Sequence, residues 1–532
     1  MTERQRSRWF NRLELLILAV GIGLRVVRFA DRRPLWLDEA LLALNIFRRH
    51  PLGYLHPLDD NQISPLGFLW GEWIVTELAG TGEKALRFLP LVAAIAALIA
   101  FARLARRILE PWAAFLATAL ASLSPLLIYY SAEVKSYGFD WLGAILVAHA
   151  TLTVIENASR DAWIRWGLAA AFSALVSTAA PFFIAGSALA LLAAPHVRRG
   201  PHAFIRIAAA GTPAALVFGL HLLTVYRSPS TTSFMQVYWT ETFLVQSVPA
   251  ALRQAALIVH GFWNAVLFGD GVVEALPRRT MTIVVATSAL GAFALGRRSL
   301  PTAVLLLAPA VLAAVASLAK WWPLTPRLLL FAVPAVLVTL PYGLATMARL
   351  APRNARIPVQ VILSVALIVA AAVGLPGEMR AQPRFIAVPE ALRELGVRHS
   401  PNATVYLSSD IGPACTYYLA WHPDRATLGG DSSSRDCTLR GTRTVIGQWP
   451  RFVGLAPGRA TRAAKTIRPE WLEREGRRIL DQPATELWVL IGNNPELRAA
   501  LPSWLESAGA MRLAEHETRG IRILTYRVTD RK

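Results

Sequence analysis

Long apolar segments recur through the first 375 residues, and short polar loops rich in arginine separate them. A helix that spans a membrane needs about 20 mostly apolar residues, and eleven segments approach this length. They lie near residues 11–29, 86–108, 112–130, 138–156, 163–179, 181–195, 204–226, 280–296, 301–319, 328–348 and 357–375. The pattern predicts a polytopic α-helical membrane protein with about 11 transmembrane helices.

Two features of this pattern leave alternatives open. The stretch 64–80 is short and contains Pro65, Glu72 and Glu77, so we predict an interfacial or re-entrant helix there. If it spans instead, the topology of the following helices inverts. Pro181 either separates two helices or kinks a single long one, because proline cannot donate the helical hydrogen bond.

The basic loops predict which side of the membrane each connection occupies. Arginines before residue 13 and within 103–107, 160–165, 198–206, 297–298 and 349–356 all fall on one side, which the positive-inside rule assigns to the cytoplasm. The first apolar segment is too long for a signal peptide core, so we expect a retained anchor. A transmembrane domain, 1–375, then has two extracytoplasmic loops, 30–85 and 227–279.

The chain changes character after the last apolar segment. Residues prone to form strands occur at 404–407, 443–446, 487–491 and 521–526, and helical patterns occur near 412–421, 470–481 and 495–508. We therefore predict a small extracytoplasmic α/β domain, 376–532. Its cysteines, Cys415 and Cys437, form a disulfide or remain two small apolar residues, and Asn402 begins a glycosylation sequon.

Composition narrows the functional classes. Hydrophobic residues make up 54% of the 532 residues and charged residues only 17%, which excludes an ordinary soluble enzyme. The 55 basic residues exceed the 35 acidic ones, but they are spread over short loops and form no nucleic-acid-binding patch. They favour anionic membrane lipids instead. The sequence contains no nucleotide-binding loop and no zinc motif.

Two adjacent carboxylates, Asp38 and Glu39, follow the first apolar segment and precede an amphipathic stretch. Acidic residues there either cap a helix or supply a general base at the membrane interface. His56, Asp59 and Asp60 lie nearby, as functional groups or as part of a solvated loop. No cofactor is predicted; a divalent metal held by Asp38, Glu39 and Asp59 or Asp60 stays an alternative.

A second polar element lies between two apolar segments. Tyr129, Tyr130, Glu133, Lys135 and Tyr137 combine a cation, a carboxylate and three phenols. Such groups suit the recognition of a lipid phosphate, although an interfacial turn has the same composition. The outer segment from Lys320 to Arg327 adds two cations and two tryptophans, which also fit an aromatic belt.

Several short motifs resemble those of the GT-C superfamily of glycosyltransferases that use polyprenyl-phosphate sugars. They lie at 35–40, 65–70, 87–90, 131–137 and 326–334. The similarity covers about residues 10–375 and is closest to the protein O-mannosyltransferase and lipid A aminoarabinose transferase branch, glycosyltransferase family 39. Gln62 to Pro65 stands where many relatives have Lys-Pro or His-Pro-Pro.

The resemblance implies an inverting transfer of a sugar from polyprenyl phosphate to an acceptor hydroxyl. Asp38 corresponds to the base, and Glu39 shares this role or orients the acceptor. Arg87, Lys135, Arg327 and Tyr137 are the expected donor-phosphate ligands, with Glu133 as a further candidate.

The expected location is a bacterial inner membrane, and the acceptor is a glycan, a lipid or a protein. A transporter or lipid flippase, or a non-catalytic membrane subunit, remains the alternative. A transporter more often shows internal repeats and ionisable groups within broken helices.

Overall fold

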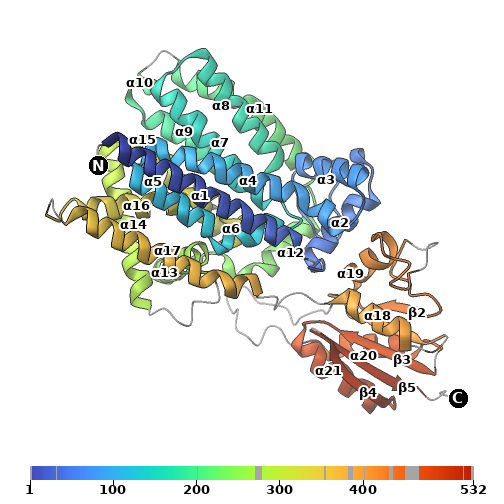
Figure 1. Ribbon diagram of the computed structural model, residues 1–532. Coiled ribbons are helices and arrows are strands. Elements are labelled where there is room, and N and C mark those ends of the chain that lie inside the picture. Colours follow the sequence, from blue (N-terminus) through green and yellow to red (C-terminus); the bar gives the residue numbers. More distant parts are fainter. Residues whose placement is uncertain are drawn as a thin grey trace. The chain divides into compact units, whose positions relative to one another are not determined.

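The computed structural model describes residues 3–31, 33–199, 202–269, 278–352, 355–380, 387–398, 400, 402–430, 435–449, 467–483, 485–518 and 520–528 (Figure 1). The chain forms two compact units. The first comprises Met1–Asp31, Gly53–Glu72 and Arg87–Ala381. The second comprises Arg32–Leu52, Trp73–Leu86 and Gln382–Lys532. Two parts of the first loop thus group with the C-terminal region, a division that a single boundary near residue 376 does not anticipate.

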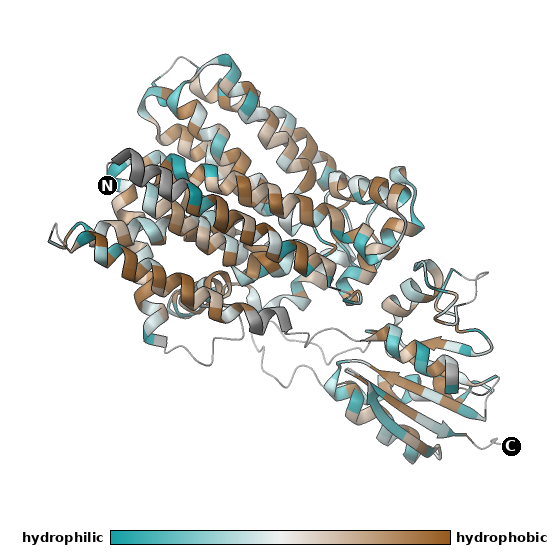
Figure 2. Ribbon diagram, in the orientation of Figure 1, coloured by the Kyte–Doolittle hydropathy of each residue, from teal (hydrophilic) through white to brown (hydrophobic). Residues whose placement is uncertain are grey.

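The first unit is helical. Its helices cover the expected apolar segments, and two further helices lie within the expected loop 227–279. The helices of this unit are α1 (Glu3–Ala30), α4 (Glu83–Ile108), α5 (Pro111–Leu123), α6 (Pro125–Tyr129), α7 (Tyr137–Glu156), α8 (Arg160–Val176), α9 (Ala180–Ala193), α10 (Pro195–Arg198), α11 (Ala203–Leu223), α12 (Pro229–Tyr238), α13 (Val248–Leu267), α14 (Arg278–Arg298), α15 (Leu300–Leu318), α16 (Val333–Ala348) and α17 (Arg356–Arg380). The helix α3 (Leu66–Ala79) begins in the first unit and ends in the second. The helix α4 begins in the second unit and continues into the first. Apolar residues dominate the long helices (Figure 2).

In the part of the chain that the structure describes, seven helices are long and apolar enough to cross a membrane. An eighth span results if α5 and the following helical segment, bent by 49°, count as one. Three other expected spans form helices that are more polar or shorter: α1 contains Glu14, Arg25 and Arg28, and α8 and α9 have 17 and 14 residues. The α8 and α9 helices are separate, and Pro181 lies in the first turn of α9.

Small residues bring α14 and α16 into close contact. A side-chain carbon at Gly291 would clash with the backbone carbonyl of Thr339, and one at Gly343 would clash with that of Thr287. Ser288 and Thr339 share a hydrogen bond of 2.5 Å across the same contact. Membrane helices commonly associate in this way, because small side chains let the backbones approach closely.

The C-terminal part of the second unit contains a five-stranded sheet in the order β2-β1-β3-β5-β4. Its strands are β1 (Thr404–Leu407), β2 (Arg443–Ile446), β3 (Glu486–Ile491), β4 (Met511–Thr518) and β5 (Ile521–Arg527). The β1 strand pairs in parallel with β2 and β3, while β5 pairs antiparallel with β3 and β4. The helices are α18 (Val388–Arg398), α19 (Gly412–Thr416), α20 (Pro469–Leu480) and α21 (Pro495–Ser507), and a π-helical turn, Tyr417–Trp421, extends α19.

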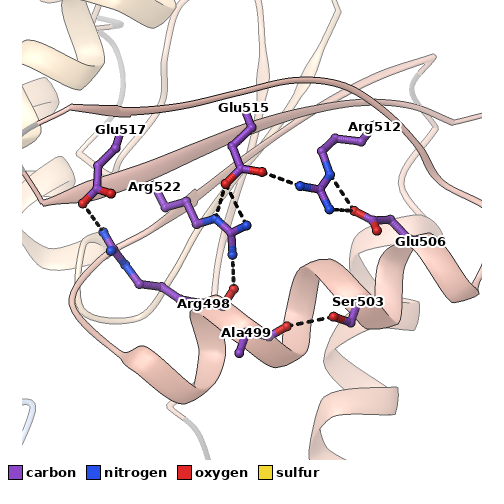
Figure 3. A network of polar contacts seen from close by, with 8 residues as sticks. All are labelled: Arg498, Ala499, Ser503, Glu506, Arg512, Glu515, Glu517 and Arg522. Carbon is purple, nitrogen blue, oxygen red and sulfur yellow. Dashed lines mark hydrogen bonds and ion pairs between the residues drawn. The ribbon is translucent and has the colours of Figure 1, made fainter.

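The β4 strand is absent from the sequence prediction. It lies at an edge of the sheet and most of its residues are exposed, so it lacks the apolar alternation of a half-buried strand. Its charges form a network instead (Figure 3): Glu515 binds Arg522, and Glu517 binds Arg498 at 3.1 Å. Charged side chains on an edge strand discourage pairing with another chain.

A buried carboxylate joins the sheet to α20. Glu475 is 2% exposed and forms an ion pair with Arg478 at 2.6 Å. It also accepts hydrogen bonds from the Tyr406 hydroxyl at 3.1 Å and from the backbone N–H of Gln448 at 3.0 Å. We expect Glu475→Ala to destabilise this domain by about 3 kcal/mol, because buried partners lose their acceptor. Faster amide exchange in β1 of the full-length protein would measure the loss.

The matched control is Glu473→Ala. Glu473 is half exposed and, among the described residues, pairs with Arg477 alone on the helix surface, where an ion pair contributes about 0.5 kcal/mol or less. Equal effects of the two substitutions would contradict a structural role for Glu475.

Candidate functional site

Asp38 and Glu39 lie in the first turn of α2 (Leu37–Arg48), in the second unit. Glu39 is fully buried, and its Oε2 accepts the backbone N–H of Trp36 at 3.3 Å. This contact caps the helix. The Asp38 side chain is only partly buried. The two adjacent carboxylates therefore differ: Glu39 stabilises the helix start, and Asp38 is the one accessible to a substrate.

The C-terminal part of the same unit holds the segment that precedes Asp38. The Tyr418 hydroxyl accepts the backbone N–H of Leu35 at 2.8 Å and donates to Glu83 Oε1 at 2.9 Å. The other oxygen of Glu83 lies 2.9 Å from His422 Nε2. Tyr418 thus connects the segment before α2 with the first residue of α4, both within the second unit.

Aromatic stacking and backbone contacts extend this anchor. The Phe47 ring, near the end of α2, stacks on Tyr417 at 6.1 Å and on Trp421 at 5.4 Å between ring centroids. The Tyr417 hydroxyl donates to the Thr81 carbonyl at 2.9 Å, and the Thr81 hydroxyl donates to the Trp421 carbonyl at 2.5 Å. We call residues 412–422 the anchor segment.

A disulfide links the anchor segment to a later loop. Cys415 in α19 is bonded to Cys437, with their Cα atoms 5.4 Å apart. Both cysteines are buried. Cross-links of this kind mainly restrict the unfolded chain, so the bond favours the folded anchor segment.

Removing the Tyr418 hydroxyl tests the anchor. In Tyr418→Phe the buried Leu35 amide loses its acceptor, which costs about 1–3 kcal/mol locally. We expect amide exchange in residues 33–44 of the full-length protein to become roughly tenfold faster or more. Tyr526→Phe is the control, because among the described residues the buried Tyr526 hydroxyl has no hydrogen-bond partner. Unchanged exchange in Tyr418→Phe would show that the anchor does not order this segment.

The expected phosphate ligands lie in the first unit. Lys135 Nζ donates to Gln62 Oε1 at 2.7 Å. A tight turn positions Gln62. In this turn Asp60 and Asn61 have left-handed backbones, and the backbone N–H of Gln62 donates to the Asp59 carbonyl at 3.2 Å. Gln62 thus orients the cation of another segment.

Three tyrosines flank Lys135 in the sequence and contact one another through their rings. The Tyr129 and Tyr130 rings meet edge to face at 4.9 Å, and Tyr130 and Tyr137 meet at 5.0 Å. Electrostatic interactions connect Tyr130 with Glu133 and with Arg327. Arg327 also lies over the Trp239 ring, 4.9 Å from its centroid. The structure therefore brings Arg327, which is almost 200 residues later in the sequence, to the tyrosine cluster.

One arginine of this cluster is missing from the sequence prediction. Arg28, near the end of α1, lies over the Tyr129 ring at 4.9 Å and 3.6 Å from Asp31. It interacts electrostatically with Glu133 and with Arg87. Both arginines are at least 98% buried. A cation within a membrane helix is unusual, but Arg25 in the same helix gives the same signal, so the sequence alone does not single out Arg28.

The remaining candidates lie at the surface. His56, Asp59 and Asp60 are exposed residues of the first unit. Among the residues that the structure describes, no three histidine, cysteine or acidic side chains gather as metal ligands would. Glu133, by contrast, is fully buried within the tyrosine and arginine cluster.

The structure superimposes on ArnT from Cupriavidus metallidurans in the apo state with a TM-score of 0.54 and 14% identity, covering 96% of this chain and 97% of that chain. ArnT bound to undecaprenyl phosphate gives a TM-score of 0.51 with the same identity and coverage.

Residues 63–222 match the family of dolichyl-phosphate-mannose-protein mannosyltransferases. This segment includes Arg87 and Lys135 but neither Asp38 nor Arg327. No curated protein matches the sequence. The fold and the family match confirm the resemblance to GT-C glycosyltransferases.

Proposed function

We propose that the protein transfers a sugar from a polyprenyl phosphate to an acceptor hydroxyl on the extracytoplasmic face of a membrane, with inversion at the anomeric carbon. The observation that carries this proposal is the cluster of Arg28, Arg87 and Arg327 with three tyrosines in the first unit. Lys135 lies two residues before Tyr137 of this cluster and is held by Gln62. Positive charge held in a partly apolar environment suits a lipid-linked phosphate. The likeness to ArnT bound to undecaprenyl phosphate supports the same class of donor.

Lys135 and Arg327 are the best placed of these cations to reach a ligand. Both side chains are partly exposed, whereas Arg28 and Arg87 are buried. Lys135 is held by Gln62, and Arg327 stacks on Trp239, so both charges have fixed positions before the donor binds. Fixed positions reduce the reorganisation that charge development requires. Tyr137 supplies a phenolic hydrogen-bond donor beside them.

In the proposed reaction Asp38 accepts the proton of the acceptor hydroxyl. The acceptor oxygen then bonds to the anomeric carbon, and the bond from that carbon to the phosphate oxygen breaks. The electron pair remains on the departing lipid phosphate, whose negative charge the cations stabilise. Glu39 keeps the helix start in place through the Trp36 amide, and it therefore positions Asp38.

A direct assay tests this function. The purified full-length protein is incubated with a panel of labelled polyprenyl-phosphate sugars and with glycan, lipid and peptide acceptors. Transfer from at least one donor, with the anomeric configuration inverted in the product, is the expected result. Hydrolysis or flipping of the donor without transfer to any acceptor class would contradict the proposal. The donor that reacts identifies the sugar.

A further inference from the structure

A groove lies between α8 and α11 in the helical unit, away from every residue assigned above. Its volume is about 560 Å³. The walls include Trp163, Leu168 and Pro213, and the two charged lining residues are Arg160 and Arg206. The two helices lie side by side (Figure 1). The groove therefore combines an apolar surface with two cations.

The packing of the helices places both arginines at the same end of the groove. Gly167 permits a close approach, since a side-chain carbon there would lie 2.7 Å from the Ala210 carbonyl oxygen. Arg160 precedes Gly167 by seven residues, and Arg206 precedes Ala210 by four. At 1.5 Å per residue, the arginines lie about 10 Å and 6 Å along their helices from this contact, toward both N-termini. The positive ends of two helix dipoles add to the arginine charges.

The charge at this end is available to a ligand. Arg160 and Arg206 are exposed, and within the described part of the chain neither has an ion-pair partner. Of the two arginines in a second groove on α8, Arg107 and Arg165, Arg107 forms hydrogen bonds to both carboxylate oxygens of Glu156, at 2.9 Å and 2.7 Å. Among the described residues, neither arginine of the groove between α8 and α11 is paired in this way. The groove between α8 and α11 thus keeps its positive charge.

We propose that the groove between α8 and α11 binds one anionic diacyl phospholipid, with the phosphate at Arg160 and Arg206 and an acyl chain along Trp163 and Leu168. Leu168 is 65% exposed and Ile164 is 48% exposed, as expected for residues that face lipid. Basic grooves between membrane helices on the cytoplasmic side commonly bind acidic headgroups. The distribution of basic loops predicts that side for both arginines.

Tryptophan quenching provides a test, because Trp163 lines the groove. The full-length protein is reconstituted in phosphatidylcholine vesicles that contain either phosphatidylglycerol or phosphatidylcholine with brominated acyl chains. Bromine quenches a nearby indole. The signal of Trp163 is the difference between wild type and Trp163→Phe, a substitution that removes an indole N–H without a hydrogen bond among the described residues. We expect stronger quenching of Trp163 by the anionic lipid.

The arginines determine whether this preference is specific. Each is expected to favour the anionic lipid by roughly fivefold, and both together by roughly 30-fold. The double substitution Arg160→Gln with Arg206→Gln should remove the preference. The control, Arg198→Gln with Arg199→Gln, removes the same charge from exposed residues of the same predicted side and should retain it.

Three outcomes would overturn the inference. They are equal quenching of Trp163 by both brominated lipids, a preference that survives loss of Arg160 and Arg206, and a preference that the control variant also loses. The quenching is also measured with excess inorganic phosphate. If phosphate abolishes the preference of Trp163 for the anionic lipid, the groove binds free anions and not a phospholipid. None of these measurements depends on glycosyl transfer, so they stand apart from the proposed function.

Discussion

Asp38→Asn is expected to reduce sugar transfer by about 10²–10⁴-fold, the usual contribution of a general base. The amide has nearly the same shape as the carboxylate but cannot accept the proton of the acceptor hydroxyl. Donor binding should be retained, because the proposed phosphate ligands belong to other segments. Turnover with labelled donor, together with donor binding measured on the same preparation, checks both statements.

Asp59→Asn and Asp60→Asn are the matched controls for this substitution. Both side chains are exposed, and the left-handed backbone of Asp60 is one that asparagine adopts readily. We expect each control to retain turnover within about twofold, because surface substitutions rarely disturb a site. If Asp38→Asn retains wild-type turnover, or if the controls lose as much, Asp38 is not the base.

Lys135→Met is expected to lower turnover by about 10²–10³-fold, as the loss of one preorganised charge at a transition state does elsewhere. The substitution keeps a long, flexible side chain but removes the charge that Gln62 orients. The loss should appear mainly in kcat, because negative charge on the phosphate bridging oxygen develops as the sugar departs. Single-turnover rates at saturating donor measure it.

Two further variants make the Lys135 result specific. Lys135→Arg keeps the charge and should retain more activity than the methionine variant. Lys84→Met removes the charge of an exposed lysine at the start of α4 and should leave turnover near that of wild type. A Lys135→Met protein with normal kcat would show that this cation does not stabilise the leaving group.

Much of the fold follows from local patterns in the sequence. Apolar length predicts the long membrane helices of the first unit but not α12 and α13, which lie in an expected loop. Pro65 and its acidic neighbours predict a short interfacial or re-entrant helix, and α3 has 14 residues. The buried strands β1, β3 and β5 are equally clear, because buried strands are rich in β-branched and aromatic residues. The edge strand β2 is only partly buried but keeps the β-branched run Thr444 to Ile446. An exposed edge strand has no such pattern, and β4 is missed for that reason.

The site is harder to predict, because its contacts join distant parts of the chain. The sequence identifies Asp38 and Glu39 as a pair but does not separate them, and only burial shows that Glu39 caps α2. In the sequence Arg28 belongs to an expected membrane anchor, and only its position over Tyr129 joins it to the site. The role of Tyr418 depends on a hydrogen bond across 383 residues, which no local pattern indicates.

That long separation has a consequence for how the protein is made. Leu35 is synthesised 383 residues before its partner Tyr418. At roughly 5–20 residues per second, the delay is about 20–80 s. During this interval the turn that carries Asp38 has been synthesised without its anchor. The proposed glycosyl transfer is therefore expected only after Tyr418 has been synthesised and has bonded to the Leu35 amide.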